Sequence, residues 1–257
     1  SLHVVTSLQE KAPSAEIRVY DAVCTAEQLN EAAPGCAVAP TIDAALDGAF
    51  FSTGQRCTAS SRLIVTEGIH NRFVEMLTEK TRALRVGPAL DPTSQMGPVV
   101  DQNQLDRDLA YIESARRDGA NLRAGGRLVR CATPGFFLEP TLFTDTAPDM
   151  RINREEVFGP VATIQRAKDY DEALALANDT EFGLTAGICT SALKYAQHFK
   201  RNAAAGMVMV NLPTAGVDYH VPFGGTKGSS YGPREQGRYA AEFFTTVKTA
   251  YTFAGTK

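Results

Sequence analysis

The sequence predicts an α/β fold with a largely parallel sheet. Short hydrophobic runs typical of strands alternate with longer runs whose apolar residues recur at helical spacing, and this alternation is typical of helices packed on parallel strands. The chain has 257 residues, 44% of them hydrophobic, which is enough to bury a full core. Its longest apolar runs are short and interrupted by glycine or charge, so we expect no membrane-spanning helix.

Charge and cysteine usage argue against several classes of function. The formal net charge of −3 provides no basic surface for nucleic acid or for a membrane. The 5 cysteines are an odd number without CxxC spacing, which favours a reducing cytoplasm over a disulfide framework or a zinc site. The 4 histidines lie far apart in the sequence, so we expect no metal site. The first residues lack a signal-peptide pattern, so we expect no secretory leader.

Residues 1–47 predict a short N-terminal βαβ-like segment. Strand-like runs at Leu2–Thr6 and Glu16–Asp21 alternate with helix-like runs, the last of which starts at Thr41, a candidate N-cap. Asp21 stands where an acidic residue can hold a nucleotide ribose, but no G-x-G-x-x-G precedes it. The alternative interpretation, a solvated carboxylate at a strand end, is the favoured one.

From Phe50 onward, helices and strands are expected in alternation. Ile69, Phe73 and Leu77 recur at helical spacing. Helices are predicted over residues 68–82, 101–119, 170–178 and 193–202, strands over 62–66, 161–166, 187–190 and 207–211, an extended segment over 136–143, and a turn at 121–126. The tail Glu242–Thr252 is rich in β-branched and aromatic residues. It predicts a terminal strand whose exposed edge would pair with another chain.

The stretch Phe50–Ala59 contains the candidate nucleophile. Cys57 directly follows Arg56, on a turn that includes Gly54 and is surrounded by small polar residues. A structural thiol would normally have apolar neighbours, whereas a nearby cation or helix terminus stabilises a thiolate. The pattern therefore indicates a nucleophilic cysteine, and the alternative is an inert small hydrophobe.

Five stretches, in order, resemble the aldehyde dehydrogenase superfamily. They are Phe51–Cys57 (F-x-x-G-Q-x-C), Glu155–Pro160 (E-E-V-F-G-P), Asn178–Ala186, Gly206–Asn211 and Pro222–Gly228 (P-F-G-G-T-K-G). One such motif would be weak, but five spread from Ala49 to Thr252 are specific to the C-terminal catalytic portion of that family. Within it, Ser52–Arg62 and Asn211–Gly225 are most similar to 2-oxoglutarate semialdehyde (2,5-dioxovalerate) dehydrogenases.

The resemblance implies a mechanism. Cys57 would attack an aldehyde to form a thiohemiacetal, with its backbone N–H as an oxyanion donor, and hydride would pass to NAD or NADP. Water would then hydrolyse the thioester to a carboxylate. Glu156 corresponds to the glutamate that binds the nicotinamide ribose, and Phe158 to the aromatic beside the ring. The alternatives are a salt-bridged surface carboxylate and a core aromatic. Glu155 is expected to be structural.

Substrate residues are also implied by position. Phe223 matches an aromatic of the family's substrate tunnel, and Asn211 and His220 lie on the loop that approaches it. A carboxylate-bearing semialdehyde calls for a cation, for which Arg56, His220 and Lys227 are candidates. A solvent-facing arginine and a turn-building lysine are the alternatives.

The family match fails over residues 1–47. Full-length members are roughly twice as long and carry a cofactor-binding domain and an E-L-G-G-K motif with the general base, which is missing here. Residues 1–47 weakly resemble instead a terminal domain of nucleotide-sugar dehydrogenases, as a remnant or a fusion. We therefore expect a catalytic domain over 48–240, an oligomerisation strand and tail over 241–257, and impaired aldehyde oxidation by this chain alone. The alternative is a non-catalytic relic that acts through assembly or partner binding.

Overall fold

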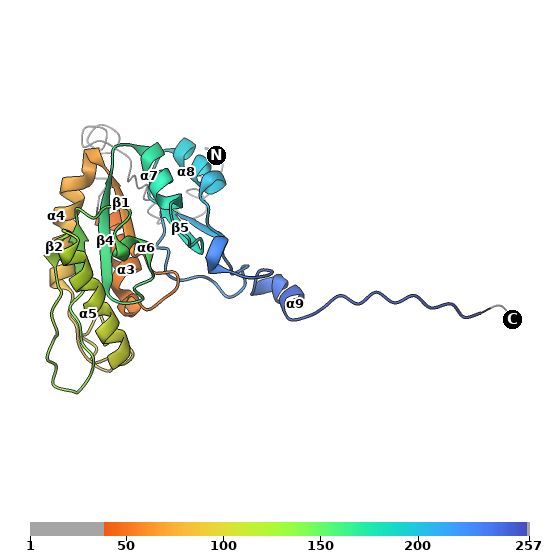
Figure 1. Cartoon of the computed structure of the whole chain (residues 1–257), viewed down its shortest axis with the longest axis horizontal. Helices are drawn as coiled ribbons and strands as arrows, with labels where there is room; N and C mark the ends of the chain where they lie inside the picture. Colours follow the sequence, from red (N-terminus) through yellow and green to blue (C-terminus); the bar gives the residue numbers. More distant parts are fainter. Residues whose placement is uncertain (1–38, 256–257) are drawn as a thin grey trace, which may run out of the picture.

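The computed structural model describes residues 39–255, in which strands alternate with helices as predicted (Figure 1). In chain order the elements are α3 (Ala39–Phe50), the 3-10 helix η1 (Phe51–Gly54), β1 (Arg62–Thr66), α4 (Glu67–Ala83), α5 (Gln102–Arg117), β2 (Asn121–Ala124), β3 (Thr141–Thr144), α6 (Arg151–Arg154), β4 (Val161–Ala167), α7 (Tyr170–Asn178), β5 (Thr185–Ile188), α8 (Leu193–Asn202), β6 (Met207–Val210), the 3-10 helices η2 (Lys227–Ser229) and η3 (Gly237–Tyr239), and α9 (Ala240–Phe243). The predictions made for residues 1–38 lie outside the described residues.

The strands of residues 39–255 form two sheets, of which the larger is mostly parallel and the smaller entirely parallel. The larger sheet has the order β1-β4-β3-β2. Strand β4 pairs in parallel with β1 and with β3, whereas β2 is antiparallel to β3. The second sheet consists of the parallel pair β5 and β6. The predicted fold class is therefore confirmed.

Helices cover both faces of the larger sheet. Consecutive residues of a strand point to opposite faces, and Leu142 and Phe143 of β3 accordingly belong to different buried clusters. One cluster joins the sheet to α3 and α4, through residues such as Phe50 and Leu77. The other joins it to α5 through residues such as Ile112. Both faces are thus buried, as parallel sheets require.

Helix α3 crosses the domain boundary that was expected after residue 47. It begins at Ala39, two residues before Thr41, so the prediction of Thr41 as an N-cap is wrong. Ile42 and Leu46 are buried in the same cluster as Phe50. An amphipathic helix is stabilised mainly by packing its apolar face, and this face packs on the larger sheet.

One predicted turn is a strand. Residues 121–126 were expected to form a turn, but Asn121–Ala124 form β2, which pairs with β3. Leu122 is partly buried against the cluster on the α5 face, and Ala124 is buried in the cluster on the other face. These tertiary contacts outweigh the local turn signal of Gly125 and Gly126.

The C-terminal tail forms no strand within the described residues. Beyond α9 it extends away from the rest of the chain (Figure 1) and leaves Val247, Tyr251 and Phe253 at least 84% exposed. A strand needs a neighbour for its backbone groups, and a single chain offers none here. Pairing with a partner stays a prediction. None of the helices in residues 39–255 combines the length and apolar composition needed to span a bilayer.

Candidate active site

The turn that carries Cys57 has an unusual backbone. After α3, the residues Ser52, Thr53 and Gly54 all have positive φ, of 55°, 60° and 65°. Non-glycine residues rarely adopt this region, and they keep it only where surrounding contacts impose it. Such contacts are present, because Thr53 Oγ1 donates to Gly97 O at 3.3 Å and Val100 N donates to Gln55 Oε1 at 2.9 Å. The turn leaves the Cys57 thiol free and exposed.

Glycine is required at position 54 because a second turn packs against it. A Cβ at Gly54 would overlap the carbonyl oxygen of Gly159, which belongs to the segment between α6 and β4. Segments about a hundred residues apart in sequence therefore touch through bare backbone. The contact brings the candidate nucleophile beside the candidate cofactor residues.

Glu155 and Glu156 occupy different environments in that second turn. Glu155 accepts hydrogen bonds from Tyr111 Oη at 2.8 Å and from Arg151 Nε at 3.0 Å. The Arg151 hydrogen bonds, followed by that of Tyr111, lower the pKa of the Glu155 carboxyl. Glu156 is exposed and joins none of the ion pairs found in residues 39–255. The structural role fits Glu155, while the Glu156 carboxylate stays available to a ligand.

Phe158 is held at the surface of the site. Its φ is 60° and its side chain is 36% exposed, so it is no core aromatic. A hollow of about 400 Å³ lies between it and Cys57. The residues lining this hollow, here called the nucleophile cavity, are Gln55, Arg56, Cys57, Thr58, Phe158, Gly216, Val217, Phe223 and Gln236. Four residues predicted from sequence are therefore brought together, namely Arg56, Cys57, Phe158 and Phe223.

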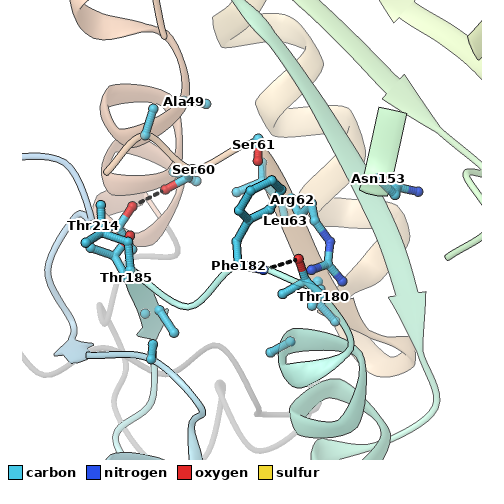
Figure 2. Close-up of a pocket in the computed structure, with 18 of the residues that line it drawn as sticks. Ala49, Ser60, Ser61, Arg62, Leu63, Asn153, Thr180, Phe182, Thr185 and Thr214 are labelled. Atoms are coloured by element: carbon cyan, nitrogen blue, oxygen red, sulfur yellow. Dashed lines mark hydrogen bonds between the residues drawn. The ribbon is translucent and has the colours of Figure 1, made fainter. Parts of the chain in front are cut away.

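A larger cavity of about 540 Å³ adjoins the same turn. It is lined by Cys57, Glu156 and Phe158 and continues along the whole of β1 and β5. Figure 2 shows the hydrogen bond of 2.6 Å that joins Ser60 to Thr214 at its wall. The two cavities share Cys57 and Phe158, so the thiol borders both of them.

Arg62, which is partly buried, supplies a cation to the larger cavity (Figure 2). Its guanidinium donates to Leu176 O at 2.6 Å, and its Nε is buried without a partner in the described part of the chain. Burial, together with the nearby charge of Arg154, lowers the pKa of Arg62. Transfer of such a group from water costs free energy unless it is paired. The side chain adds positive potential to this wall.

Three of the predicted substrate residues, Asn211, His220 and Lys227, do not line the nucleophile cavity. Asn211 has both ends of its amide engaged, since its Oδ1 accepts from Thr190 N at 2.7 Å and its Nδ2 donates to Thr190 O at 3.0 Å. His220 is exposed and lies edge-on against Tyr219. Lys227 Nζ donates to two backbone carbonyls at 2.7 and 3.0 Å, so it builds a turn. Any role of Asn211 in specificity must act through the loop that it anchors.

Gln236 is a cavity residue that the sequence analysis missed. Phe223 and Glu235 exchange backbone hydrogen bonds of 2.7 and 2.8 Å, which places Gln236 close to Phe223. Its Oε1 is buried without a partner among the described residues. No sequence pattern marks this position, because the pairing of residues 223 and 235 is visible only in the fold.

Comparisons with known proteins identify the family of the chain. A model of the aldehyde dehydrogenase family matches residues 32–250. An alpha-ketoglutarate semialdehyde dehydrogenase of Haloferax volcanii is 45% identical over 83% of this chain and 44% of its own length. A betaine aldehyde dehydrogenase of Brucella anthropi is 42% identical with the same coverage. The chain spans less than half the length of these curated relatives.

Solved structures show the same fold. The NAD+ complex of an aldehyde dehydrogenase from Bacillus cereus superposes with a TM-score of 0.80 at 33% identity. The match covers 85% of this chain and 44% of that one. The family match also includes residues 32–47, which the sequence analysis had assigned to a separate segment.

Proposed function

Because the chain belongs to the aldehyde dehydrogenase family, we propose that it carries the nucleophile and the nicotinamide end of the cofactor site of an enzyme that oxidises an aldehyde to a carboxylate. The observation that carries this proposal is the exposed Cys57 thiol, which shares a cavity with Phe158 and Phe223. An exposed thiol on a constrained turn beside aromatic walls suits attack on a small carbonyl compound.

The chain's own residues would perform defined steps. The Cys57 thiolate forms a C–S bond to the aldehyde carbon, and the carbonyl π electrons move to oxygen, where the Cys57 N–H can donate. The bound nicotinamide supplies the acceptor for the hydride that leaves this carbon. Attack of water on the resulting thioester breaks the C–S bond, releases the carboxylic acid and returns the thiol.

The residues present fit NAD+ or NADP+ at the nicotinamide end. Glu156 offers an exposed carboxylate with acceptor oxygens for a pair of ribose hydroxyls. Phe158 presents a partly exposed ring two residues further on. Both line the larger cavity together with Cys57, so a ring placed there would lie close to the thiol.

For the substrate we infer a semialdehyde with a distal carboxylate, such as 2-oxoglutarate semialdehyde. Arg56 lines the nucleophile cavity, and its guanidinium can form bidentate hydrogen bonds with a carboxylate. Phe223 would pack on the aliphatic part of the substrate, while Asn211 and His220 would act from the neighbouring loop. The odd cysteine count favours the reducing cytoplasm as the location.

A second function rests on the exposed apolar tail. Phe244, Val247 and Tyr251 are between 77% and 99% exposed, and large apolar groups in such numbers mark interaction surfaces. We infer that the chain forms a homo-oligomer through this tail. The oligomer would either be the catalytic form of the enzyme or serve assembly in a chain that has no catalytic activity. Light scattering of the whole chain, compared with the variant Val247→Asp, measures this: an unchanged mass would reject the tail as the contact.

Cofactor binding and turnover test the first function. NAD+ and NADP+ are titrated into the purified chain by calorimetry, 2-oxoglutarate semialdehyde is added, and reduced nicotinamide is followed by absorbance. Betaine aldehyde, which is cationic, serves as the contrasting substrate. Turnover that is lost in Cys57→Ser supports the proposal. We expect that turnover to be slow because the sequence contains no E-L-G-G-K motif. Absence of both binding and turnover would reject the enzyme assignment for this chain.

A further inference from the structure

Helix α5 carries a buried carboxyl group that the reaction scheme does not use. Asp108 is 0% exposed. Its Oδ1 accepts a hydrogen bond of 2.7 Å from Gln104 Nε2, and its Oδ2 has no partner within residues 39–255. An ionised carboxylate usually needs several donors to replace water. Asp108 is therefore poorly suited to carry a charge in this position.

Asp108 lies directly beneath the turn that holds the candidate cofactor residues. A Cβ at Gly159 would overlap both carboxyl oxygens of Asp108. Gln104, in turn, donates from the same Nε2 to Val157 O at 3.0 Å. The two side chains of α5 therefore contact the turn on either side of Phe158, whose positive φ has to be imposed by its surroundings.

The contact continues to the nucleophile. The carbonyl oxygen of Gly159 packs against Gly54, three residues before Cys57. Asp108, Gly159 and Gly54 thus form a stack that leads from the interior of α5 to the nucleophile turn. Closely packed stacks transmit displacement, because interiors contain little free volume.

The charge state of Asp108 is open to change near neutral pH. Burial raises the pKa of its carboxyl to about 6, against smaller lowering effects of the Gln104 hydrogen bond and of Arg107 on the same helix. The facing turn contributes Glu155, which is bound by Arg151 and Tyr111, and the exposed Glu156. The nucleophile turn contributes the exposed Arg56. None of these facing groups provides Asp108 with a hydrogen bond.

We propose that Gln104 and Asp108 are positioning residues that hold Glu156 and Phe158 against the Cys57 turn, and that they do so while Asp108 is protonated. Loss of the proton leaves a buried anion with one donor. Displacement of the turn lets water reach the anion and relieves this cost. The function of the positioned turn rests on the enzyme assignment made above, whereas the proton-dependent packing does not.

Hydrogen exchange of backbone amides measures the packing directly. The Val161 amide donates to Gly159 O at 2.8 Å, and the Thr141 amide donates to Pro160 O at 2.8 Å, so both report on opening of the turn. After correction for intrinsic exchange, we expect their rates in the whole chain to rise about tenfold from pH 5 to pH 7, from linkage between a pKa of about 6 and an unfolded value of 3.8.

Matched variants identify the group responsible. Asp108→Asn keeps the shape and mimics the neutral acid, so its corrected rates should not change with pH. Asp106→Asn removes an exposed carboxyl of the same helix and should follow the wild type. Equal pH dependence in wild type and Asp108→Asn would overturn the proposal.

The effect on the nucleophile needs its own measurement. Cys57 is labelled with iodoacetamide, and its tryptic peptide, residues 57–62, is quantified by mass spectrometry. The ratio of labelling rates between wild type and Asp108→Asn should change at least threefold between pH 5 and pH 7. A constant ratio would reject the positioning role. Neither readout needs aldehyde or cofactor, so failure of the enzyme assignment would show separately as absent NAD+ binding.

Discussion

Cys57 and Cys189 line the same large cavity but have opposite surroundings. Cys57 is exposed on a turn of positive-φ residues. Cys189 follows β5, and burial raises the pKa of its thiol to about 11. The same cavity is therefore lined by one exposed thiol and by one that burial keeps protonated at neutral pH. The comparison teaches that local backbone geometry and desolvation decide reactivity, whereas residue type and proximity to a cavity do not.

Gly54→Ala would disrupt the reactive side of this comparison most strongly. The new Cβ would overlap Gly159 O at a φ of 65°, and clash and strain together cost roughly 3 kcal/mol or more in free energy of unfolding. We expect lower stability in urea unfolding and slower, less selective labelling of Cys57. Gly119→Ala is the control, since its φ is 93° but no atom lies within 4 Å of the added Cβ. It should cost only about 1 kcal/mol, and equal losses in both variants would contradict the packing argument.

Asp108→Asn tests the effect of desolvation on a second group. Burial raises the pKa of the Asp108 carboxyl, as it raises the pKa of the Cys189 thiol. Because the folded pKa of about 6 exceeds the unfolded 3.8, the folded state binds more protons between these values. The stability from the protonated Asp108 is complete below pH 3.8 and is lost as pH rises through 6. The variant should therefore gain stability relative to wild type over this window, by up to about 3 kcal/mol. Urea unfolding at pH 4, 5, 6 and 7 measures the difference, and a parallel offset at all four pH values would exclude titration of Asp108.

The two thiols should also differ in labelling rate. At pH 8 a thiol with a pKa of about 11 is ionised to roughly one part in a thousand, whereas Cys57 is exposed to the reagent. We expect iodoacetamide to label Cys57 at least about 100-fold faster than Cys189 in the folded chain. In denaturant the two rates should converge, and a ratio near one in the folded state would refute the contrast.

Much of the fold was predictable because the elements are amphipathic. The helices at residues 170–178 and 193–202 were predicted with the bounds that the structure has. Strand β2 was missed because Gly125 and Gly126, which directly follow it, look like a turn and because its partner strand lies about twenty residues further along the chain. The start of α3 was misplaced at Thr41, since capping signals are local while the helix is stabilised by its packing against the sheet.

The site was predictable only as far as motifs reach. Cys57, Phe158 and Phe223 were singled out by sequence and line one cavity. Gln104 and Asp108 were not, because their importance arises from contact with a turn about fifty residues later. Gln236 escaped for the same reason. Residues that support a site from another element carry no motif of their own, so only the fold reveals them.

The exposed tail sets a length scale for assembly. A fully extended chain spans about 3.4 Å per residue, so residues 244–255 can reach about 40 Å. A surface that pairs with this segment can therefore lie a full domain width away from α9. Binding of that kind depends on the effective concentration that the tether imposes. Shortening residues 244–255 would weaken this binding steeply once the extended segment is shorter than the distance between α9 and the partner surface. The loss would occur even if every contact residue were kept.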